Sequence, residues 1–521
     1  MLIEDQSDVI RFLKQPKTYG LKKEPVEMLD SNISAVFLAG DKAYKLKRGV
    51  KYPYVDFSSP QKRLNACQQE IMVCERFAPG ICLGIETIVQ DKKGRLFLRE
   101  FHHGQDVEVR DYLLVMRRLD ERDFFYDRVR QKTADRFETM DLAEKLWEMH
   151  KTAPVFKHRG GAEVIKRRIV ENNALIKCFA PEIFNEETVR RLDEKQREVL
   201  IRQAALLDKR RDEGKIRWCH GDLRLCNIAV MNDRVTLLNP IEFYDDLTQI
   251  DTLYDMAFLL TDMSKSGLTR LTSILFNHYM ACSADWEGIP ALPLFMSCRA
   301  GVQAYVFAQR AHDAEYPSEK AHFAEQAREY LDLAYAFITP KPPVLVACGG
   351  LSGSGKSRMA REMAPEVAIA PGAVVLRDDV LRKNMFHVGQ NDSLGEDSFL
   401  GHRERDVYDA LFKEAEHVIL NGHSVVLDAL FFKPEFRRRA EDLAKKLNVS
   451  FCGFWVDAPL EVRAQRVAKR KRNPSDVKSL EALKKQLDID VGEVTWHQID
   501  SSRDRNETLA RVFEILREKN I

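Results

Sequence analysis

The stretch that decides the fold of the C-terminal third reads Gly350-Leu351-Ser352-Gly353-Ser354-Gly355-Lys356-Ser357. It fits the pattern G-x-x-x-x-G-K-[ST], and it lies between an apolar run that predicts a buried strand and a run that predicts a helix. Glycines let backbone N–H groups turn toward phosphate oxygens, and the start of a helix adds favourable partial charge. The stretch therefore predicts a nucleotide-binding phosphate loop. The alternative is a glycine-rich turn without a ligand.

The side chains of this loop have expected roles. Lys356 would reach the β- and γ-phosphates of ATP, and the Ser357 hydroxyl would coordinate Mg²⁺. The predicted ATP-binding residues of the loop are Gly350, Ser352, Gly353, Ser354, Gly355, Lys356 and Ser357.

The residues around the loop alternate between predicted strands and helices. Strands are expected at 344–349, 424–429 and 451–456, and helices at 403–420, 434–447, 459–472 and 506–519. This alternation is typical of a parallel sheet with helices on both faces. Prolines at 340, 342 and 343 follow a helical pattern over 318–337, so we divide the chain into domains at 1–339 and 340–521.

Charged residues near the loop supply the remaining chemistry of this domain. In the segment 377–382, Asp379 would accept a hydroxyl proton and Arg382 would hold an acidic or phosphorylated group of the substrate. Asp428 ends an apolar strand, which is the usual place of a metal-binding acid. Arg466 and Arg470 share a helix face and would close over the phosphates, although a solvated basic face is the alternative.

Residues 344–500 resemble the small-molecule P-loop kinases that include gluconate kinase, chloramphenicol phosphotransferase and the zeta toxins. The stretch Asn473-Pro474-Ser475-Asp476 and the later Gln486 match a branch of predicted kinases within that group. The resemblance implies transfer of a phosphoryl group from ATP to a small molecule. That branch often has Ser-Asp where this chain has Asp378-Asp379, so the resemblance places the base at Asp379.

A second candidate site begins at His220-Gly221-Asp222-Leu223-Arg224-Leu225-Cys226-Asn227, which reads H-G-D-x-x-x-x-N. An aspartate that accepts a proton from an alcohol, followed five residues later by an amide that binds Mg²⁺, is the catalytic-loop arrangement of phosphotransferases. We therefore expect Asp222 to be a catalytic base and Asn227 a metal ligand. A strand pattern at 235–238 follows them.

This order of motifs resembles the aminoglycoside phosphotransferase family over roughly residues 25–335. In that family an aspartate after the catalytic loop binds Mg²⁺. This chain has Glu242 at the matching place, so the resemblance makes Glu242 the metal ligand, with Asn239 as the other position considered. Asp251 and Asp255 would brace the catalytic loop, or else cap the helix that follows them.

The region before residue 115 reads as a small lobe of strands, expected at 35–38, 43–46, 96–101 and 112–116, with one helix at 61–77. Lys45 matches the nucleotide-binding lysine of the resembling family, and Lys47 on the same face of the strand is the fallback. Glu70, on the helix, would pair with that lysine and hold it against the α- and β-phosphates. Helical patterns dominate after residue 141, and this order is the outline of a protein-kinase-like fold.

Composition excludes some function classes. The chain has 81 Lys and Arg against 80 Asp and Glu, which gives a net charge of +1. Its net charge therefore provides no overall electrostatic attraction for nucleic acid or an anionic membrane. The first five residues, MLIED, lack the basic start of a signal peptide, and no stretch approaches the roughly 18 uncharged apolar residues of a membrane span. We therefore expect a cytoplasmic protein with neither nucleic acid nor membrane as a partner.

Together the motifs predict a two-lobed, kinase-like α+β domain followed by a P-loop α/β domain. The whole arrangement resembles bacterial proteins described as bifunctional aminoglycoside phosphotransferase and ATP-binding protein. It implies ATP and Mg²⁺ as cofactors and a hydroxyl group of a small molecule as acceptor. Three hypotheses stay open. Both domains are kinases; or only the P-loop domain is catalytic and the other binds substrate or regulates; or ATP gates an interaction. The sequence does not decide the acceptor or the oligomeric state.

Overall fold

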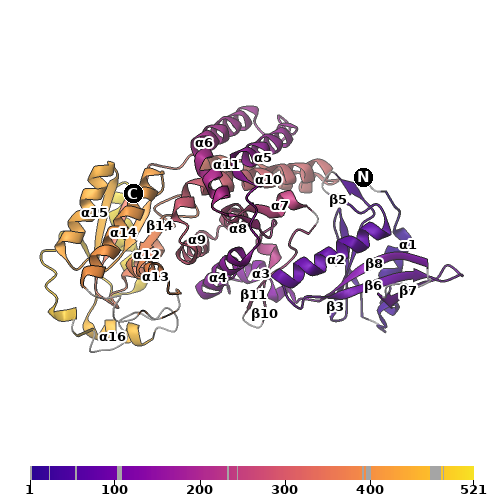
Figure 1. Cartoon of the computed structure of the whole chain (residues 1–521), viewed down its shortest axis with the longest axis horizontal. Coiled ribbons are helices and arrows are strands. Elements are labelled where there is room, and N and C mark those ends of the chain that lie inside the picture. The colour runs from indigo at the N-terminus through magenta and orange to yellow at the C-terminus, as the bar shows by residue number, and fades with distance from the viewer. Residues whose placement is uncertain are drawn as a thin grey trace. The chain divides into compact units, whose positions relative to one another are not determined.

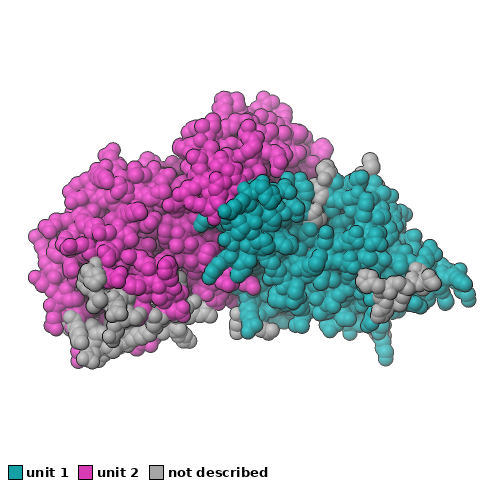
Figure 2. All heavy atoms as spheres, viewed as in Figure 1, with its two compact units in different colours: residues 1–134, 149–159, 214–255 teal, residues 135–148, 160–213, 256–521 magenta. Residues whose placement is uncertain are grey.

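The computed structural model describes residues 3–22, 24–52, 55–101, 108–231, 234–242, 244–389, 392, 394, 401–469, 483–484 and 486–521. The chain forms two compact units, which Figure 2 colours separately: unit 1 comprises residues 1–134, 149–159 and 214–255, and unit 2 comprises residues 135–148, 160–213 and 256–521. The chain passes between the units within α4 (Arg136–Thr152) and α8 (Thr252–Lys265). The boundary predicted at residues 339 and 340 lies inside unit 2, and that division of the chain stays a prediction.

Unit 1 is built on an antiparallel sheet whose described strands run in the order β1-β2-β3-β8-β6-β7. Figure 1 labels β3, β6, β7 and β8 of this sheet. The strands are β1 (Glu27–Asp30), β2 (Ser34–Ala39), β3 (Lys42–Lys47), β6 (Cys82–Gln90), β7 (Leu96–Glu100) and β8 (Glu108–Arg117). Buried and half-buried residues alternate along β2, as expected for a strand with one face on a core. Phe37 and Leu46 pack in that core with Val9 and Leu13 of α1 (Ser7–Leu13).

The long helix α2 (Pro60–Phe77) carries one of the predicted site residues. It begins where it does because the side chain of Ser59 accepts a hydrogen bond from the backbone N–H of Lys62 and Pro60 occupies the first turn. Its buried residues include Cys67, Glu70 and Cys74, which helical periodicity places on one face. The carboxylate of Glu70 is therefore directed inward rather than toward solvent.

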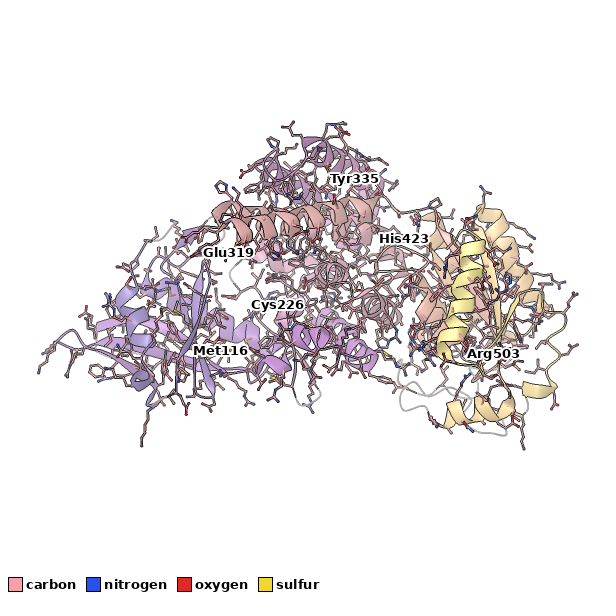
Figure 3. All side chains as sticks on the ribbon, turned by 180° about the vertical axis from the view of Figure 1, so that it is seen from behind. Met116, Cys226, Glu319, Tyr335, His423 and Arg503 are labelled. Atoms are coloured by element: carbon pink, nitrogen blue, oxygen red, sulfur yellow. The ribbon has the colours of Figure 1, made fainter. Side chains whose placement is uncertain are left out.

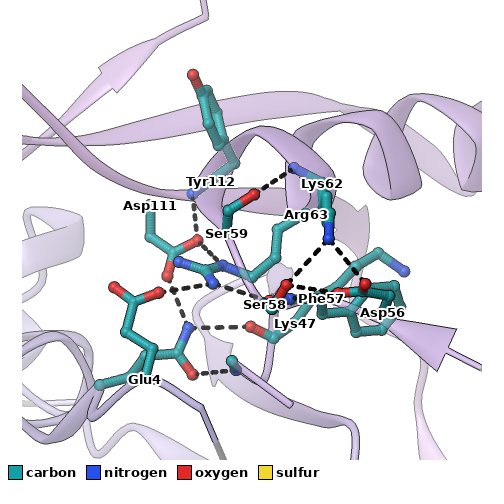
Figure 4. Close-up of polar contacts among 12 residues, drawn as sticks. Glu4, Lys47, Asp56, Phe57, Ser58, Ser59, Lys62, Arg63, Asp111 and Tyr112 are labelled. Carbon is teal, nitrogen blue, oxygen red and sulfur yellow. Dashed lines mark hydrogen bonds and ion pairs between the residues drawn. The ribbon is translucent and has the colours of Figure 1, made fainter. Parts of the chain in front are cut away.

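Arg63 of α2 ties the helix to the sheet and to the N-terminal segment (Figure 4). Its Nε donates a hydrogen bond to Oδ1 of Asp111 at 2.8 Å, and its Nη1 forms an ion pair with Glu4 at 2.8 Å. Arg63 is fully buried, and these two carboxylates compensate its charge. Gln6 Nε2 bridges Asp111 and the backbone carbonyl of Lys47, at 2.7 and 3.0 Å, so the same network holds the end of β3.

The remaining elements of unit 1 are short. They are β4 (Lys51–Tyr52), β5 (Val55–Asp56), α3 (Phe125–Arg130), β9 (Ile216–Trp218), β10 (Ile228–Met231), β11 (Arg234–Leu237), α7 (Asp245–Thr248) and β12 (Gln249–Asp251). Two antiparallel pairs, β9 with β12 and β10 with β11, lie on either side of the loop 220–227 in the sequence. They fix both ends of that loop.

The helical part of unit 2 precedes the P-loop domain. Its helices are α4, α5 (Gly161–Lys177), α6 (Glu186–Asp212), α8, α9 (Thr269–Ser283), α10 (Leu292–Asp313) and α11 (Pro317–Ile338). The first ten residues of α8 are all buried, which is the pattern of a helix surrounded by protein. Tyr335 of α11 is labelled in Figure 3. Arg191 of α6 lies over its ring, 4.9 Å from the centroid, and donates a hydrogen bond to its hydroxyl at 2.7 Å.

The P-loop domain has a parallel sheet whose described strands run in the order β14-β15-β13-β16-β17. The strands are β13 (Val344–Gly349), β14 (Val374–Arg377), β15 (Val425–Asp428), β16 (Ser450–Asp457) and β17 (His497–Asp500). The helices are α12 (Lys356–Met363), α13 (Asp378–Met385), α14 (Gly401–Leu420), α15 (Pro434–Leu447), α16 (Leu460–Ala468) and α18 (Arg505–Glu518). Every residue of β13 is buried, because it is the central strand of a sheet packed on both faces.

The predicted fold class is confirmed in both parts of the chain: a small sheet-rich lobe and helices, followed by a parallel α/β domain. The helix predicted at 318–337 is α11, and the strand predicted at 344–349 is β13. A helix that crosses a membrane needs about 20 mostly apolar residues. None of the described helices combines such a length with enough apolar character.

Candidate functional site

The phosphate loop connects β13 to α12 in unit 2. Because α12 begins at Lys356, the N–H groups of its first turn have no intrahelical acceptor and can bind an anion. Gly353 and Gly355 have φ angles of +81° and +101°, which L side chains rarely adopt. A Cβ on Gly353 would also meet the carbonyl oxygen of Arg463 at 2.7 Å. The chain therefore requires glycine at 353 for a local and a tertiary reason.

Two side chains hold the backbone of the loop in place. Nε of the buried Arg463 donates a hydrogen bond to the carbonyl of Ser352 at 2.9 Å. Oε1 of Gln486 accepts hydrogen bonds from Nη2 of Arg463 at 3.0 Å and from the backbone N–H of Ser352 at 3.1 Å. A loop that is held in this way needs little ordering when phosphate binds.

Arg466, predicted to lie over the phosphates, contacts the loop itself. Its Nη1 donates hydrogen bonds to the carbonyl of Ser354 at 3.0 Å and to Oγ of Ser501 at 2.9 Å. Its guanidinium therefore braces the loop in addition to lining the cavity beside it. Arg470, the second predicted residue of this kind, lies outside the described residues.

Ser357 and Asp428 supply oxygen ligands of the kind that Mg²⁺ prefers. Oγ of Ser357 donates a hydrogen bond to Oδ1 of Asp428 at 3.1 Å, across 71 positions of sequence. The Asp428 side chain is only 2% exposed, and Nε of Arg377 lies 3.5 Å from its Oδ2. A hydroxyl at the start of α12 in contact with a carboxylate at the end of β15 fits a magnesium site. These two residues are the ones that would hold the ion.

The two acids at the start of α13 differ in their electrostatic environment. Burial opposes ionisation of Asp379, but the ion pair with Nη2 of Arg377 at 2.6 Å outweighs it and lowers the pKa of Asp379. Burial raises the pKa of Asp378 to about 6. A general base works best when its pKa is near the working pH. Asp378 is therefore a second candidate for the base, beside the predicted Asp379.

These groups line one cavity of about 1260 Å³ within unit 2. The predicted residues in its lining are Ser352, Gly353, Gly355, Lys356, Ser357, Asp379, Arg382 and Arg466. Three of the predicted residues do not line this cavity: Gly350, Ser354 and Asp428. They lie beneath the loop or at the sheet edge. Ligand pockets commonly measure about 300–1,000 Å³, so this cavity has room for ATP and a second small molecule.

In unit 1, two lysines of β3 share one glutamate. Nζ of Lys45 lies 2.7 Å from Oε1 of Glu70, and Nζ of Lys47 lies 2.7 Å from Oε2. Lys47 also contacts Oε1 of Glu242 at 2.6 Å. The Lys47 side chain is 2% exposed and that of Lys45 is 16% exposed, so Lys45 is the more accessible cation. The structure thus brings the predicted lysine, its fallback and both glutamates together.

The charges of this cluster compensate one another. Burial would raise the pKa of Glu70, but the ammonium groups of Lys45 and Lys47 hold that pKa at about 2. Burial opposes the charged form of Lys47, yet Glu70 and Glu242 raise the pKa of Lys47 above its ordinary value. Burial and the charge of Glu70 raise the pKa of Glu242. Of the two carboxylates in the cluster, Glu242 is therefore the one that is protonated more easily.

The loop 220–227 positions the second set of predicted residues. Oδ1 of Asp222 accepts a hydrogen bond from Nε of Arg224 at 2.8 Å, and Oδ2 accepts from Nη2 of Arg224 at 3.0 Å and from Nδ2 of Asn227 at 2.9 Å. Oδ1 of Asn227 accepts from Nδ2 of Asn239 at 3.2 Å. Both oxygens of the predicted base are therefore engaged within unit 1.

The two later acids have separate roles. Asp255 braces the catalytic loop, because its carboxylate accepts hydrogen bonds from the backbone N–H groups of His220 at 3.1 Å and Gly221 at 2.9 Å. Asp251 instead accepts from the backbone N–H of Leu253 at 2.9 Å and caps the start of α8. Bracing the loop therefore applies to Asp255, and capping the helix applies to Asp251.

Sequence reasoning missed the cations that engage both candidate bases. Arg224 lies two residues after Asp222, and Arg377 lies two residues before Asp379. An arginine so close to an acid in sequence was the available signal. The sequence alone does not say that the side chains turn toward each other, because that depends on the backbone of each loop.

The C-terminal segment has the sheet order and the glycine loop of a P-loop domain. A family model described as AAA domain matches residues 345–489, which confirms the predicted P-loop class of this segment. An uncharacterized protein of Mycobacterium tuberculosis is 27% identical over 504 residues, covering 94% of this chain and 95% of that protein. An uncharacterized protein of Mycobacterium bovis matches to the same extent, 27% over 504 residues.

Solved structures of two kinds are similar to parts of the chain. A choline/ethanolamine kinase family protein from Mesorhizobium loti covers 64% of this chain and 99% of its own, at 13% identity and a TM-score of 0.38. The APS kinase of Mycobacterium tuberculosis covers 34% of this chain and 98% of its own, at 23% identity and a TM-score of 0.26.

Proposed function

We propose that this chain is an ATP-dependent phosphotransferase that phosphorylates a hydroxyl group of a small molecule, and that the P-loop domain carries this reaction. One observation supports the proposal above the others. The cavity of about 1260 Å³ is lined at once by Lys356 and Ser357 of the phosphate loop, by Asp378 and Asp379, and by Arg382. Phosphate-binding groups, candidate bases and a substrate-binding cation therefore face the same space.

In this proposal Lys356 and the N–H groups at the start of α12 bind the β- and γ-phosphates. Mg²⁺ held by Ser357 and Asp428 would neutralise the charge that develops on the phosphates. Asp379, or Asp378 beside it, takes the proton of the acceptor hydroxyl. At the same time the oxygen of that hydroxyl forms a bond to the γ-phosphorus. The bond between that phosphorus and the bridging oxygen breaks, and ADP leaves. Arg382 orients the acceptor.

For unit 1 we propose a second ATP·Mg²⁺ site of the same reaction class. Lys45, held by Glu70, would bind the α- and β-phosphates, and Asn227 and Glu242 would hold the metal. Asp222 would be the base. The oxygen donors of Asn227 and Glu242 suit a hard cation. In support, Lys47 links Glu70, the partner of Lys45, to Glu242, and Asn227 is hydrogen-bonded to Asp222.

A different role for unit 1 has a specific observation in its favour. Both oxygens of Asp222 accept hydrogen bonds from Arg224 and Asn227, and Glu242 is ion-paired with Lys47. Asp379 is held by a cation in the same way, so the observation that distinguishes unit 1 is the ion pair of Glu242, which occupies the carboxylate that would bind the metal. In this second candidate function, only the P-loop domain transfers phosphate and unit 1 binds substrate or regulates.

The deciding experiment is a phosphorylation screen of a metabolite pool with ATP·Mg²⁺, read by mass spectrometry. It compares the full chain with the variants Lys356→Ala and Asp222→Asn. A product lost only with Lys356→Ala supports the P-loop reaction, and a second product lost only with Asp222→Asn supports two active sites. If the wild type forms no phosphorylated product, the phosphotransferase proposal fails and a nucleotide-gated interaction is favoured.

A further inference from the structure

The cavity beside the phosphate loop carries more positive charge than a nucleotide site uses. Besides Lys356 and the predicted Arg382 and Arg466, its lining includes Arg136 and Arg361, which belong to neither predicted ATP-binding set. Arg136 is the first residue of α4, in the helical part of unit 2 that precedes the prolines at 340–343. Arg361 lies on α12 of the P-loop domain. Two parts of the chain therefore supply cations to one cavity.

Arg361 is half-buried, and the acids nearest to it, Asp428 and Glu362, form no ion pair with it. Among the described residues it has no ion pair, and its Nε is buried without any hydrogen-bond partner. Its neighbours add to the imbalance, because burial and then the charges of Arg377 and Arg136 lower the pKa of Arg361 to about 10. A buried guanidinium nitrogen without a hydrogen-bond partner is unfavourable, so such a group is retained where a ligand supplies the missing acceptor.

Arg136 has a similar lack of acidic partners. Its guanidinium lies over the ring of Phe137, 4.4 Å from the centroid, and no described carboxylate pairs with it. Phe137 itself lines the same cavity. Arg270 of α9, another cation in the lining, is by contrast neutralised by Glu362 at 2.6 Å. Arg136 and Arg361, together with Arg358, are thus cations of the lining for which the described residues provide no ion pair.

The position of Arg361 separates it from the nucleotide phosphates. It follows Lys356 by five residues on α12, which is about 7.5 Å along a helix axis. The charged groups that act on it are Arg377, Arg136, Asp428 and Glu362. Arg377 and Asp428 end β14 and β15, and Arg377 is ion-paired with the candidate base Asp379. The cluster therefore lies on the side of the loop where the acceptor and its base meet.

We propose that Arg136 and Arg361, with Arg377 beside them, bind an anionic group of the acceptor of the P-loop domain, a phosphate, sulfate or carboxylate. This inference rests on the proposed phosphotransferase function and names its substrate class: a hydroxylated small molecule that already carries a negative group. It also makes the helical segment before residue 340 part of the acceptor site, through Arg136. Arginine suits this role because its planar fork binds such oxyanions in a bidentate manner.

The test uses the full chain saturated with AMPPNP·Mg²⁺, so that the nucleotide site is filled. Sodium sulfate is titrated at ionic strength held constant with sodium chloride, and binding is followed by calorimetry. The wild type should bind sulfate saturably. Arg136→Gln and Arg361→Gln should each weaken sulfate binding by about tenfold, the usual loss for one charge-assisted hydrogen bond, while the AMPPNP affinity changes less than twofold. Arg511→Gln removes the same charge from the surface of α18 and is the matched control.

The kind of anion is read from three related compounds in the same titration: glycerol 3-phosphate, glycerate and glycerol. Saturable binding of the phosphate or the carboxylate, with none for glycerol, identifies the group that the site takes. Equal binding of glycerol would overturn the proposal. So would the absence of sulfate binding by the wild type, or an equal loss of AMPPNP affinity in the arginine variants, which would assign the cluster to the nucleotide.

Two further measurements distinguish failure of this proposal from failure of the proposed function and from loss of the fold. If the wild type binds no AMPPNP, the proposed function fails, and the anion site is then judged by sulfate titration in the Lys356→Ala background, where the phosphate loop is weakened. The melting temperature of the ligand-free chain separates binding from structure. Arg361→Gln removes a repelled charge and should leave the melting temperature unchanged or raise it, whereas a clear drop would mean that Arg361 serves the fold.

Discussion

Nζ of Lys47 lies 2.6 Å from Oε1 of Glu242, although the two residues are 195 positions apart in the sequence. The contact joins the end of β3 to the segment after β11, and both side chains are almost fully buried. Because of this contact, the two lysines of β3 have different roles within unit 1. Lys47 compensates two buried carboxylates, whereas Lys45 pairs with Glu70 alone and keeps part of its surface open to a ligand.

This division of tasks predicts different effects of two similar substitutions. Lys47→Met leaves Glu70 and Glu242 buried with too little compensation, and breaking a buried pair typically costs about 3–5 kcal/mol. Lys45→Met should cost clearly less stability but weaken nucleotide binding by unit 1. Urea denaturation and nucleotide titration measure the two effects. Equal loss of stability in both variants would contradict the assignment, and Glu242→Gln in the Lys47→Met background should restore part of the loss.

Lys356→Ala should abolish phosphotransfer by the P-loop domain while the melting temperature stays close to that of the wild type. The substitution removes the charge that balances the γ-phosphate, and positioning with charge stabilisation supplies most of the catalysis in such sites. The Lys356 side chain lines a cavity rather than a core. Turnover of the full chain with a P-loop substrate gives the measurement, and unchanged turnover would refute the assignment.

Asp222→Asn should abolish any phosphotransfer by unit 1 and leave its nucleotide binding intact, because Lys45, Glu70 and Glu242 remain. Arg224→Gln is the informative companion, since it frees both oxygens of Asp222 from their guanidinium partner. If the Arg224 contact restrains the base, activity of this variant should rise. Loss of nucleotide binding and stability together in Asp222→Asn would show that Asp222 is structural.

Glu242→Gln should raise the Mg²⁺ concentration needed for half-maximal activity of unit 1, because a neutral amide is a much weaker ligand for a hard cation. Glu242→Asp keeps the charge and should retain activity. Asn239→Asp should have a modest effect. Full activity in Glu242→Gln together with none in Asn239→Ala would place the metal at the earlier residue.

Asp378 and Asp379 should respond to pH in opposite directions. The folded pKa of Asp378 is about 6, above its ordinary value of 3.8, so its contribution to stability falls as the pH rises through this window. Asp378→Asn should therefore raise the melting temperature at pH 7 and have little effect below pH 4.

The folded pKa of Asp379 is lowered, so its contribution to stability is present above pH 3.8 and lost in acid. Asp379→Asn should lower the melting temperature at pH 7. Calorimetry of the nucleotide-free chain checks both.

Much of the P-loop domain was predictable from sequence because its signals are local. A continuous apolar run predicts β13, and the loop from Gly350 to Ser357 depends on conformations that only certain residues adopt, such as the left-handed backbone at Gly353. Asp428, the predicted metal ligand, ends a buried strand of the parallel sheet, as the apolar run before it indicates. In unit 1, the H-G-D-x-x-x-x-N order placed Asp222 and Asn227 in one loop, and they are hydrogen-bonded there.

The pairing of the buried charges is visible only in the folded chain. Strand and helix periodicity, together with motifs of eight residues or fewer, are enough to predict the two classes of site. They do not determine that Lys47 faces Glu242, that Arg224 engages both oxygens of Asp222, or that Arg136 and Arg361 line one cavity. The physical reason is that a local motif is specified by the backbone preferences of neighbouring residues. The partner of a buried charge is instead specified by packing between segments that lie far apart along the chain.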